Sequence, residues 1–195
     1  MSRLTREDII AGAGRRFATH GYHGTSMRDL GDDLGILGSS IYAHVGGKQE
    51  LLVAVIERGA AFFEASANSA RERGEGPESV LRLLVAGHID VVLDHRSEAR
   101  TYLSETHVLD PEVRASIAAT RDRYERVFVD TIAAGVDTGA FAPTTNPRLA
   151  AIYVLSVLNT IDRWFDERGR ITRTGLADDV NAFVLRGLVG EFGPG

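Results

Sequence analysis

Apolar side chains recur with the period of an α-helix along almost the whole of this chain of 195 residues. No stretch alternates apolar and polar residues for long enough to predict a β-strand. Glycine and proline interrupt the helical pattern at intervals, as expected between helices. The sequence therefore predicts an all-α fold, with helices that begin after Thr5 and Ser26 and others over residues 38–45, 48–73, 78–94, 97–108, 111–136, 147–166 and 175–190.

The composition excludes several classes of protein. The absence of cysteine excludes disulfides, zinc–thiolate sites and thiol nucleophiles. The N-terminus is charged where a signal peptide would become apolar, and the longest uncharged apolar stretch, Leu149–Ile161, is too short to span a bilayer. We therefore expect a cytoplasmic protein with no membrane partner.

The formal net charge of −5 is unevenly distributed along the chain. Residues 1–48 carry +1 and the remainder carries −6, and Lys48 is the only lysine. Because an acidic chain has little bulk attraction for nucleic acid, any contact with DNA must depend on a few well-placed side chains.

Two short predicted helices near the N-terminus have the spacing of a helix-turn-helix. Ser26 and Asp29 have the spacing of a capping box at the start of the first of them. The second, over residues 38–45, follows after a short turn, and in this motif the second helix can enter the major groove. We expect Gly31 and Gly38 each to weaken their helix by about 1 kcal/mol relative to alanine.

Several blocks of residues between positions 4 and 56 stand at a recognisable spacing. They are Thr5–Phe17, Gly21–Tyr22, Gly24–Leu30, Leu34–Ile36, Ile41–His44 and Lys48–Leu52. Together they resemble the DNA-binding domain of TetR/AcrR-family transcriptional regulators. The resemblance implies a helix-turn-helix DNA-binding domain, assigned here to residues 1–48. It also implies a larger helical domain for effector binding and dimerisation, assigned to residues 49–195.

The resemblance and the side-chain chemistry together suggest which residues contact DNA. Arg28 can form a bidentate contact with guanine or clamp a phosphate. Two serines on the second short helix can reach base edges, and the other candidates suit phosphate oxygens. The alternative for each is a structural role, such as capping for Ser26 or ring packing for Tyr42. The predicted DNA-binding residues are Thr25, Ser26, Arg28, Ser39, Ser40, Tyr42, His44 and Lys48.

The predicted helices over residues 147–166 and 175–190 are unusually apolar. A helix that is apolar nearly all round needs two apolar neighbours. One interpretation is that the first of them is a central core helix. The other, which we favour, is that one side of each helix packs inward while the other side forms a homodimer interface.

Aromatic and polar residues among the aliphatic side chains of the larger domain are typical of an effector pocket, with simple core packing as the alternative. Tyr124–Phe128, Asn159–Phe165 and Leu185–Leu188 resemble a branch of the family that controls fatty-acid or sterol breakdown. That resemblance implies a small apolar or acyl-CoA-type effector, whose phosphates would require arginines. Arg121 and Arg123 are further candidates for hydrogen bonds to those phosphates. The predicted ligand-binding residues are Tyr102, His107, Tyr124, Phe128, Asn159, Asp162 and Arg163.

The sequence shows no catalytic set, and we expect no cofactor and no metal. His88, Asp90 and Asp94 fall on one predicted helix, but no two histidines have the i, i+4 spacing of a metal site. The sequence therefore predicts a ligand-responsive homodimeric repressor that its effector releases from a palindromic operator. The alternative is an all-α small-molecule binding protein or enzyme with a vestigial helix-turn-helix.

Overall fold

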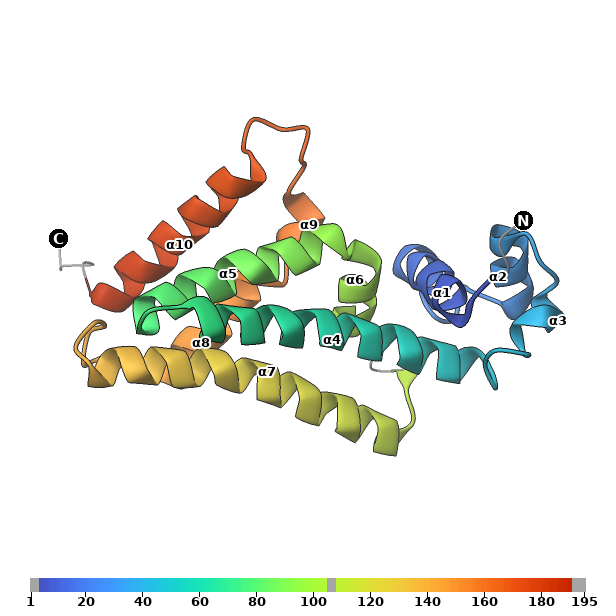
Figure 1. The fold of residues 1–195 in the computed structure, drawn as a ribbon, viewed down its shortest axis with the longest axis horizontal. Coiled ribbons are helices and arrows are strands. Elements are labelled where there is room, and N and C mark those ends of the chain that lie inside the picture. The colour runs from blue at the N-terminus through green and yellow to red at the C-terminus, as the bar shows by residue number, and fades with distance from the viewer. Residues whose placement is uncertain (1–3, 105–107, 191–195) are drawn as a thin grey trace. The chain divides into compact units, whose positions relative to one another are not determined.

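The computed structural model describes residues 4–104 and 108–190. All regular secondary structure in these two ranges is helical, which confirms the predicted all-α fold (Figure 1). Within the same ranges no helix is long and apolar enough to cross a membrane. The helices are α1 Arg6–His20, α2 Met27–Leu34, α3 Gly38–Ile41, α4 Lys48–Arg73, α5 Pro77–Asp94, α6 Arg96–Ser104, α7 Pro111–Asp137, α8 Pro147–Leu158, α9 Ile161–Trp164 and α10 Arg173–Val189.

Side-chain caps begin the first two helices at the residues predicted from the sequence. The Asp8 amide donates to the Thr5 hydroxyl oxygen at 3.2 Å, and the Thr5 amide donates to the Asp8 carboxylate at 2.8 Å. Ser26 and Asp29 form the same reciprocal pair, at 3.2 and 2.9 Å. The hydrogen bonds with Ser26 lower the pKa of Asp29, because they favour its charged form.

The described residues form two compact units. The first contains the chain up to residue 62 and the described part of residues 95–120, and the second contains residues 63–94 and 121–190. Helix α4 contributes residues to both units. Because these units group residues by packing alone, the functional boundary between residues 48 and 49 stays a prediction.

The core of the first unit contains one apolar face of α1. Ile10, Ala13 and Phe17 are 3%, 0% and 1% exposed, and α1 packs against α6. Helix α6 also approaches α4 closely, since a Cβ on Gly59 would lie 2.7 Å from the carbonyl oxygen of Glu98. A side chain at position 59 would therefore force the two helices apart.

Helices α2 and α3 form the helix-turn-helix, and two glycines bring their backbones together. A Cβ on Gly31 would lie 2.5 Å from the backbone nitrogen of Gly38, and a Cβ on Gly38 would lie 2.7 Å from the carbonyl oxygen of Met27. The expectation that these glycines only weaken their helices is therefore incomplete. Their low helix propensity accompanies a backbone approach that no other residue allows.

The predicted helix over residues 38–45 is shorter in the structure, because α3 ends at Ile41. The amides of His44 and Val45 both donate to the carbonyl oxygen of Ile41, at 2.9 and 3.2 Å. This sharing of one acceptor ends the regular helical ladder and directs the chain into the turn that precedes α4.

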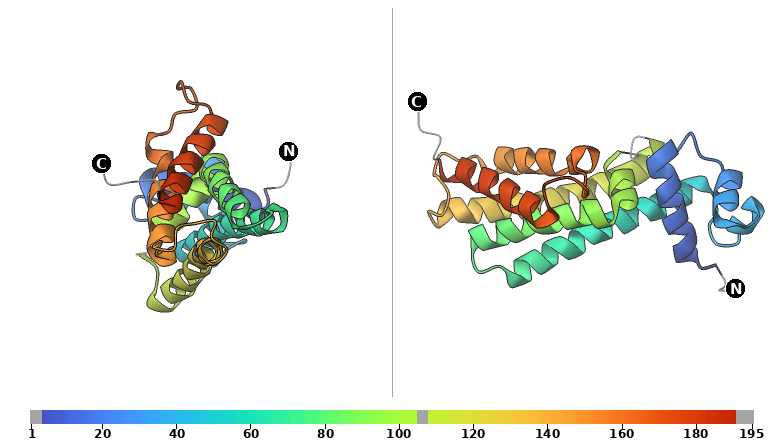
Figure 2. Two further views of the ribbon diagram at one scale, coloured as in Figure 1. Left: turned by 90° about the vertical axis from the view of Figure 1, so that its left-hand side faces the viewer. Right: turned by 90° about the horizontal axis from the view of Figure 1, so that it is seen from above.

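In the second unit one predicted helix is divided in two, and the predicted start of the last helix is confirmed within two residues. The predicted helix over residues 147–166 is interrupted, because the amide and hydroxyl of Thr160 both donate to the Val157 carbonyl oxygen, at 3.3 and 2.9 Å. This tight turn separates α8 from the short helix α9. Helix α10 begins behind Thr172, whose hydroxyl oxygen accepts from the Gly175 amide at 3.1 Å. In Figure 2 helices α8 and α10 lie next to each other, and α10 also contacts α5.

Candidate nucleic-acid interface and interior cluster

The surface of α2 and α3 carries exposed polar residues at positions predicted to contact DNA. Ser39 and Ser40, the two central residues of α3, are exposed, while the neighbouring Ile41 is fully buried. Arg28 is exposed near the start of α2, and Tyr42, directly after α3, is 55% exposed. These four polar side chains are accessible to a partner, and the buried isoleucine fixes the short helix to the core.

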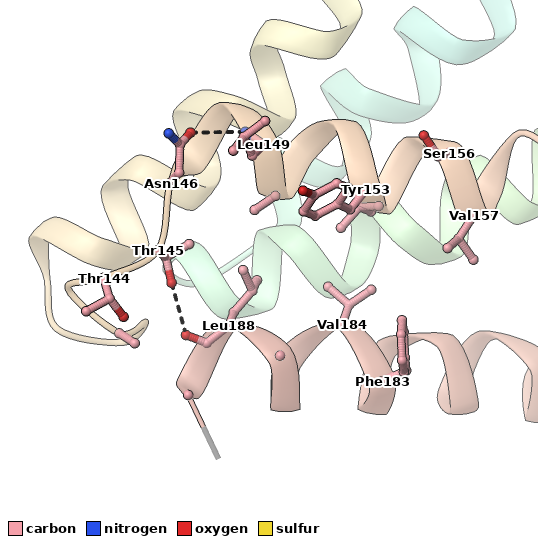
Figure 3. Close-up of a pocket in the computed structure, with 15 residues that line it drawn as sticks. Thr144, Thr145, Asn146, Leu149, Tyr153, Ser156, Val157, Phe183, Val184 and Leu188 are labelled. Atoms are coloured by element: carbon pink, nitrogen blue, oxygen red, sulfur yellow. Dashed lines mark hydrogen bonds between the residues drawn. The ribbon is translucent and has the colours of Figure 1, made fainter. Parts of the chain in front are cut away.

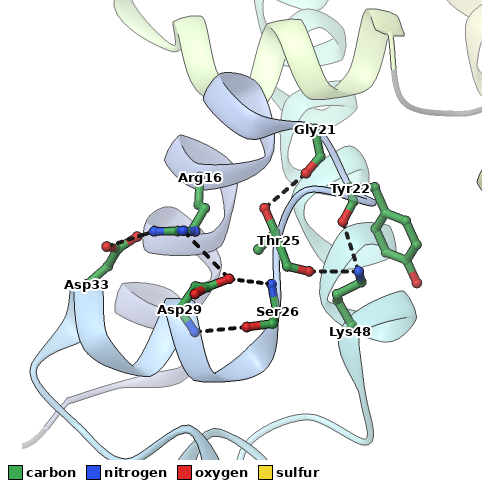
Figure 4. Close-up of polar contacts among 8 residues, drawn as sticks. All are labelled: Arg16, Gly21, Tyr22, Thr25, Ser26, Asp29, Asp33 and Lys48. Atoms are coloured by element: carbon green, nitrogen blue, oxygen red, sulfur yellow. Dashed lines mark hydrogen bonds and ion pairs between the residues drawn. The ribbon is translucent and has the colours of Figure 1, made fainter.

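Lys48, the only lysine, begins α4 and binds the segment that joins α1 to α2 (Figure 4). Its ammonium donates to the carbonyl oxygens of Tyr22 and Thr25, each at 2.8 Å, and lies 4.1 Å from the centroid of the Tyr22 ring. An ammonium has three protons, so two are engaged within the protein. This positioning role adds to the phosphate contact predicted for Lys48, and the sequence contained no signal for it.

The remaining predicted phosphate contacts differ in their accessibility. The Thr25 side chain is 2% exposed, and its hydroxyl donates to the Gly21 carbonyl oxygen at 2.9 Å. The exposed Ser26 caps α2 through its hydroxyl oxygen, and His44 is half-buried in the turn after α3. Their contacts with DNA stay predictions.

The side chain of Arg16 on α1 forms ion pairs with two carboxylates of α2, a role that nothing in the sequence indicated (Figure 4). One guanidinium nitrogen donates to both carboxylate oxygens of Asp33, at 3.0 and 2.9 Å, and another lies 3.6 Å from the Asp29 carboxylate. The Arg16 side chain is 18% exposed, so these contacts are partly shielded from solvent. Arg16 therefore helps to orient the helix that carries Arg28.

In the second unit a group of aromatic and polar side chains is buried between α4, α5 and α7. We call Phe63, His88, Tyr124 and Phe128 the interior cluster. The Nδ1 atom of His88 lies 3.0 Å from the Tyr124 hydroxyl oxygen. The Phe63 ring lies 4.8 Å from the His88 ring and 5.4 Å from the Tyr124 ring, and the Phe128 ring lies 5.5 Å from that of Tyr124.

Burial keeps the imidazole of His88, within the interior cluster, in its neutral form. His88 is 1% exposed, and burial lowers its pKa from 6.5 to about 3, an effect that the Asn159 side chain partly opposes. The imidazole is therefore neutral at pH 7. From the sequence, His88 was a candidate only for metal binding, because its spacing does not reveal a tyrosine partner on another helix.

The structure brings together some of the predicted ligand-binding residues and separates others. Tyr124 and Phe128 belong to the interior cluster. A side-chain hydrogen bond from Asn159 acts on the cluster's histidine, His88, and raises its pKa. Tyr102 is buried in the first unit. On α9, Asp162 is half-buried and Arg163 is exposed. His107 lies outside the described residues.

The acidic residues near His88 in sequence form ion pairs with an arginine. Arg173 at the start of α10 lies 2.7 Å from the Asp94 carboxylate, 2.7 Å from that of Glu167 and 3.7 Å from that of Asp90. Within residues 4–104 and 108–190 no three histidine or acidic side chains come together as metal ligands would. This ion-pair group ties the start of α10 to the end of α5.

An apolar groove lies between α8 and α10 (Figure 3). Its volume is about 680 Å³. Leu149, Tyr153 and Phe183 line it and are 47%, 66% and 64% exposed. The Ser156 hydroxyl in the groove donates to a carbonyl of its own helix at 2.7 Å, so this polar group needs no outside partner. Such an exposed concentration of large apolar side chains is typical of an interaction surface.

Family comparisons agree with this arrangement of a helix-turn-helix and a larger helical unit. The family model for bacterial regulatory proteins of the tetR family matches residues 9–55. The model for the tetracyclin repressor-like C-terminal domain matches residues 74–188. The two matches together account for the N-terminal motif and most of the remaining chain.

Individual relatives extend over nearly the whole chain. The transcriptional repressor KstR2 of Mycobacterium tuberculosis is 24% identical over 187 residues, which are 95% of this chain and 94% of KstR2. The solved structure of this ketosteroid transcriptional regulator has a TM-score of 0.87 over 96% of both chains, at 22% identity.

Two further solved structures are similar. The TetR-family regulator PfmR of Thermus thermophilus is 30% identical, with a TM-score of 0.83 over 91% of this chain and 97% of PfmR. AibR in complex with isovaleryl coenzyme A and operator DNA is 24% identical, with a TM-score of 0.83 over 96% of this chain and 99% of AibR. Because the family models match both parts of the chain, it belongs to the TetR family of bacterial regulatory proteins and is a ligand-responsive, DNA-binding transcriptional regulator, not an enzyme with a vestigial helix-turn-helix.

Proposed function

We propose that the chain acts in the cytoplasm as a homodimeric repressor, and that a small apolar or acyl-CoA-type effector releases it from a palindromic operator. The observation that carries the DNA-binding part is the exposed polar surface of α2 and α3, positioned by the buried Ile41. Two such surfaces in a symmetric dimer would enter successive major grooves, so the operator would have two-fold symmetry.

The proposed DNA contacts divide into two kinds. Arg28, Ser39 and Ser40 contact base edges. A guanidinium pairs well with guanine, and a serine hydroxyl can donate a hydrogen bond to a base edge or accept one from it. The other contacts hold phosphates and set the orientation of the protein on the duplex. For Lys48 that contact would use its remaining ammonium proton, because two protons bind carbonyl oxygens. The proposed phosphate contacts are Thr25, Ser26, Tyr42, His44 and Lys48.

The proposed dimer interface is the groove of α8 and α10, within the ranges 147–166 and 175–190. Its exposed side chains Leu149, Tyr153 and Phe183 are large and apolar. A two-fold axis brings the same surface of each subunit together, so one apolar patch per chain is sufficient. Burying these side chains against a second copy removes apolar area from water.

The effector is proposed to bind among the helices of the larger domain. The interior cluster supports this proposal, because a neutral polar pair within apolar rings is typical of ligand sites. The likeness to AibR, whose structure contains isovaleryl coenzyme A, favours an acyl-CoA. Phosphates of such a ligand would need cations, and the exposed Arg163 and Arg123 are candidates. Arg123 also lies 3.5 Å from the Glu64 carboxylate.

Release from DNA would require the effector to favour one arrangement of the dimer over another. A ligand shifts such an equilibrium only by its difference in affinity for the two arrangements. Helix α4 is the proposed connection, because its first residue contacts the α1–α2 segment while its later residue Phe63 belongs to the interior cluster.

Footprinting of the DNA upstream of the chain's own gene, over a series of salt concentrations, tests the proposed function. We expect protection of a palindrome, with affinity that falls steeply as salt rises because phosphate contacts release counterions. Addition of the effector should abolish the protection. A failure to protect any palindrome at low salt would contradict the operator proposal, while continued protection with effector bound would contradict release.

A further inference from the structure

The outward side of α10 carries two opposite charges next to its apolar residues. Four exposed side chains share this side, because they lie three, four and seven residues from the first of them. We call them the α10 stripe: Asp179, Ala182, Phe183 and Arg186. Phe183 also lines the groove between α8 and α10 (Figure 3). The stripe therefore borders the surface proposed above as the dimer interface.

The two charges of the α10 stripe are not paired within the subunit. The side chains of Asp179 and Arg186 have no ion-pair or hydrogen-bond partner among the described residues. At the start of the same helix, by contrast, Arg173 lies 2.7 Å from the carboxylates of both Asp94 and Glu167. Asp179 and Arg186 are separated by about 10.5 Å along the helix axis, too far to pair with each other. A charge at the edge of a buried apolar contact is stabilised by an opposite charge, which another molecule can supply.

Two-fold symmetry determines which residues of such a helix can face each other. Where two copies of one helix cross antiparallel at the axis, the numbers of facing residues add to a constant. If the crossing lies between Ala182 and Phe183, Asp179 faces Arg186 of the partner subunit, and this pair occurs twice. Each charge is then about 5 Å from the crossing along its helix, so the facing side chains can meet. A parallel arrangement would instead place like charges against each other.

We propose that α10 crosses α10 of a second copy antiparallel between Ala182 and Phe183, so that Asp179 of each subunit pairs with Arg186 of the other. This inference rests on the proposed function and deepens it, because it names the residues that face each other in the dimer. The apolar groove alone specifies neither a register nor a particular partner. The two ion pairs specify both, since a related chain that lacks either charge would leave the other unpaired.

Charge reversal in the full chain tests this register. Asp179→Arg places two arginines face to face twice in each dimer, and Arg186→Asp does the same with two aspartates. We expect each variant alone to dimerise about tenfold or more weakly than the wild type in sedimentation equilibrium, because like charges repel across an interface. An equimolar mixture of the two variants should dimerise about as tightly as the wild type, since every facing pair is again opposite in charge. The double variant Asp179→Arg/Arg186→Asp should likewise form its own dimer.

A neighbouring acidic residue provides the matched control. Asp178 is also exposed on α10 but lies about 100° around the helix from Asp179. Asp178→Arg should therefore stay dimeric, and it should not restore dimerisation to Arg186→Asp. Near 1 M salt, where the screening length is about 3 Å, the two weakened variants should regain most of their affinity. Thermal unfolding of each variant establishes that it is folded.

Crosslinking keeps the inference testable if a charge-reversed variant does not fold. The chain contains no cysteine, so an introduced thiol is unique. A mixture of Asp179→Cys and Arg186→Cys chains should form disulfide-linked dimers under a mild oxidant. Each variant alone should form few, because like positions lie about 10 Å apart along the helices, beyond the roughly 7 Å between Cα atoms that a disulfide allows.

The outcomes separate this inference from the function on which it rests. Single variants that dimerise as tightly as the wild type, or a mixture that dimerises no more tightly than they do, overturn the inference. So does crosslinking of like positions in preference to the mixed pair. A dimeric wild type that protects an operator, together with any of these results, leaves the proposed function in place. A monomeric wild type contradicts the proposed homodimer and the inference with it, while a charge-dependent dimer that protects no operator contradicts the proposed function alone.

Discussion

The ammonium of Lys48 lies 2.8 Å from the carbonyl oxygen of Tyr22 and 4.1 Å from the centroid of the same residue's ring. The cation thus holds both the backbone and the side chain of the segment before α2. The first residue of α4 is thereby connected to the segment from which the helix-turn-helix begins. A change at Lys48 is expected to affect the fold of the domain and its contact with DNA together.

Replacement of Lys48 by methionine should lower the free energy of unfolding by about 1–3 kcal/mol, because two backbone carbonyls lose a charged donor. Chemical denaturation measures the loss. Arg15→Met is the matched control, since it removes one positive charge from an exposed position on α1. Equal stability of the Lys48→Met variant and the wild type would show that water replaces the ammonium at no cost.

Replacement of Gly31 by alanine should destabilise the protein by about 1–3 kcal/mol, in spite of alanine's higher helix propensity. The reason is the 2.5 Å approach between the added Cβ and the backbone nitrogen of Gly38. Gly47→Ala is the control, because a Cβ there has no heavy atom within 4 Å. Its unfolding free energy should change by about 0.5 kcal/mol or less. A stabilised Gly31→Ala variant would mean that α2 and α3 can separate freely.

Stability should fall as the pH is lowered below about 6.5, because His88 is buried in its neutral form. Its pKa is about 3 in the folded protein and 6.5 as an ordinary side chain, so between these values the unfolded chain binds a proton that the folded chain excludes. The slope contributed by this one group approaches about 1.4 kcal/mol per pH unit.

Denaturant titrations between pH 4 and pH 7 measure this slope. His88→Phe should have a shallower dependence on pH than the wild type. His20→Gln, which alters an exposed histidine on α1, should keep the wild-type dependence. Identical slopes for the wild type and His88→Phe would refute the assignment of a buried neutral imidazole.

Arg28→Ala and Tyr42→Ala should weaken DNA binding in different ways. Loss of a bidentate guanine contact costs about 1–3 kcal/mol and relaxes the base preference at one position. Loss of a phosphate contact weakens binding to all sequences alike. Selection from a randomised operator library, followed by affinity measurements, distinguishes the two. If both variants relaxed the base preference equally, the proposed division of contacts would be wrong.

Phe183→Glu should convert a dimer into monomers, because a carboxylate would be buried in the apolar groove between α8 and α10. Phe183 is 64% exposed in the single chain, so its replacement should leave the subunit folded. Sedimentation should give twice the chain mass of 21.1 kDa for the wild type and the single mass for the variant. Ala119→Glu on the exposed surface of α7 adds the same charge elsewhere and should stay dimeric. A dimeric Phe183→Glu would place the interface on another surface.

Local features of the fold were predictable from the sequence, because their causes lie within a few residues. The caps at Thr5 and Ser26 each depend on a partner three residues later, and the prolines that begin α5, α7 and α8 act through their own backbone. The accessible positions of Ser39 and Ser40 on the second short helix were predicted in the same way.

Contacts between distant segments were not predictable, since no spacing in the chain encodes them. The carbonyls that bind Lys48 lie 26 and 23 residues away, and Tyr124 lies 36 residues from His88. The break between α8 and α9 also escaped prediction, because Thr160 fits a helix by composition and only its folded hydrogen bonds reveal the turn.

The helical class, the helix starts and the family could be predicted from the sequence, because periodicity, caps and motif spacing are properties of neighbouring residues. The roles of the glycines and of the single lysine, and the burial of His88 against Tyr124, appear only in the folded chain. The physical reason is that close packing and burial depend on which helices meet. That information arises only when residues far apart in the chain come together.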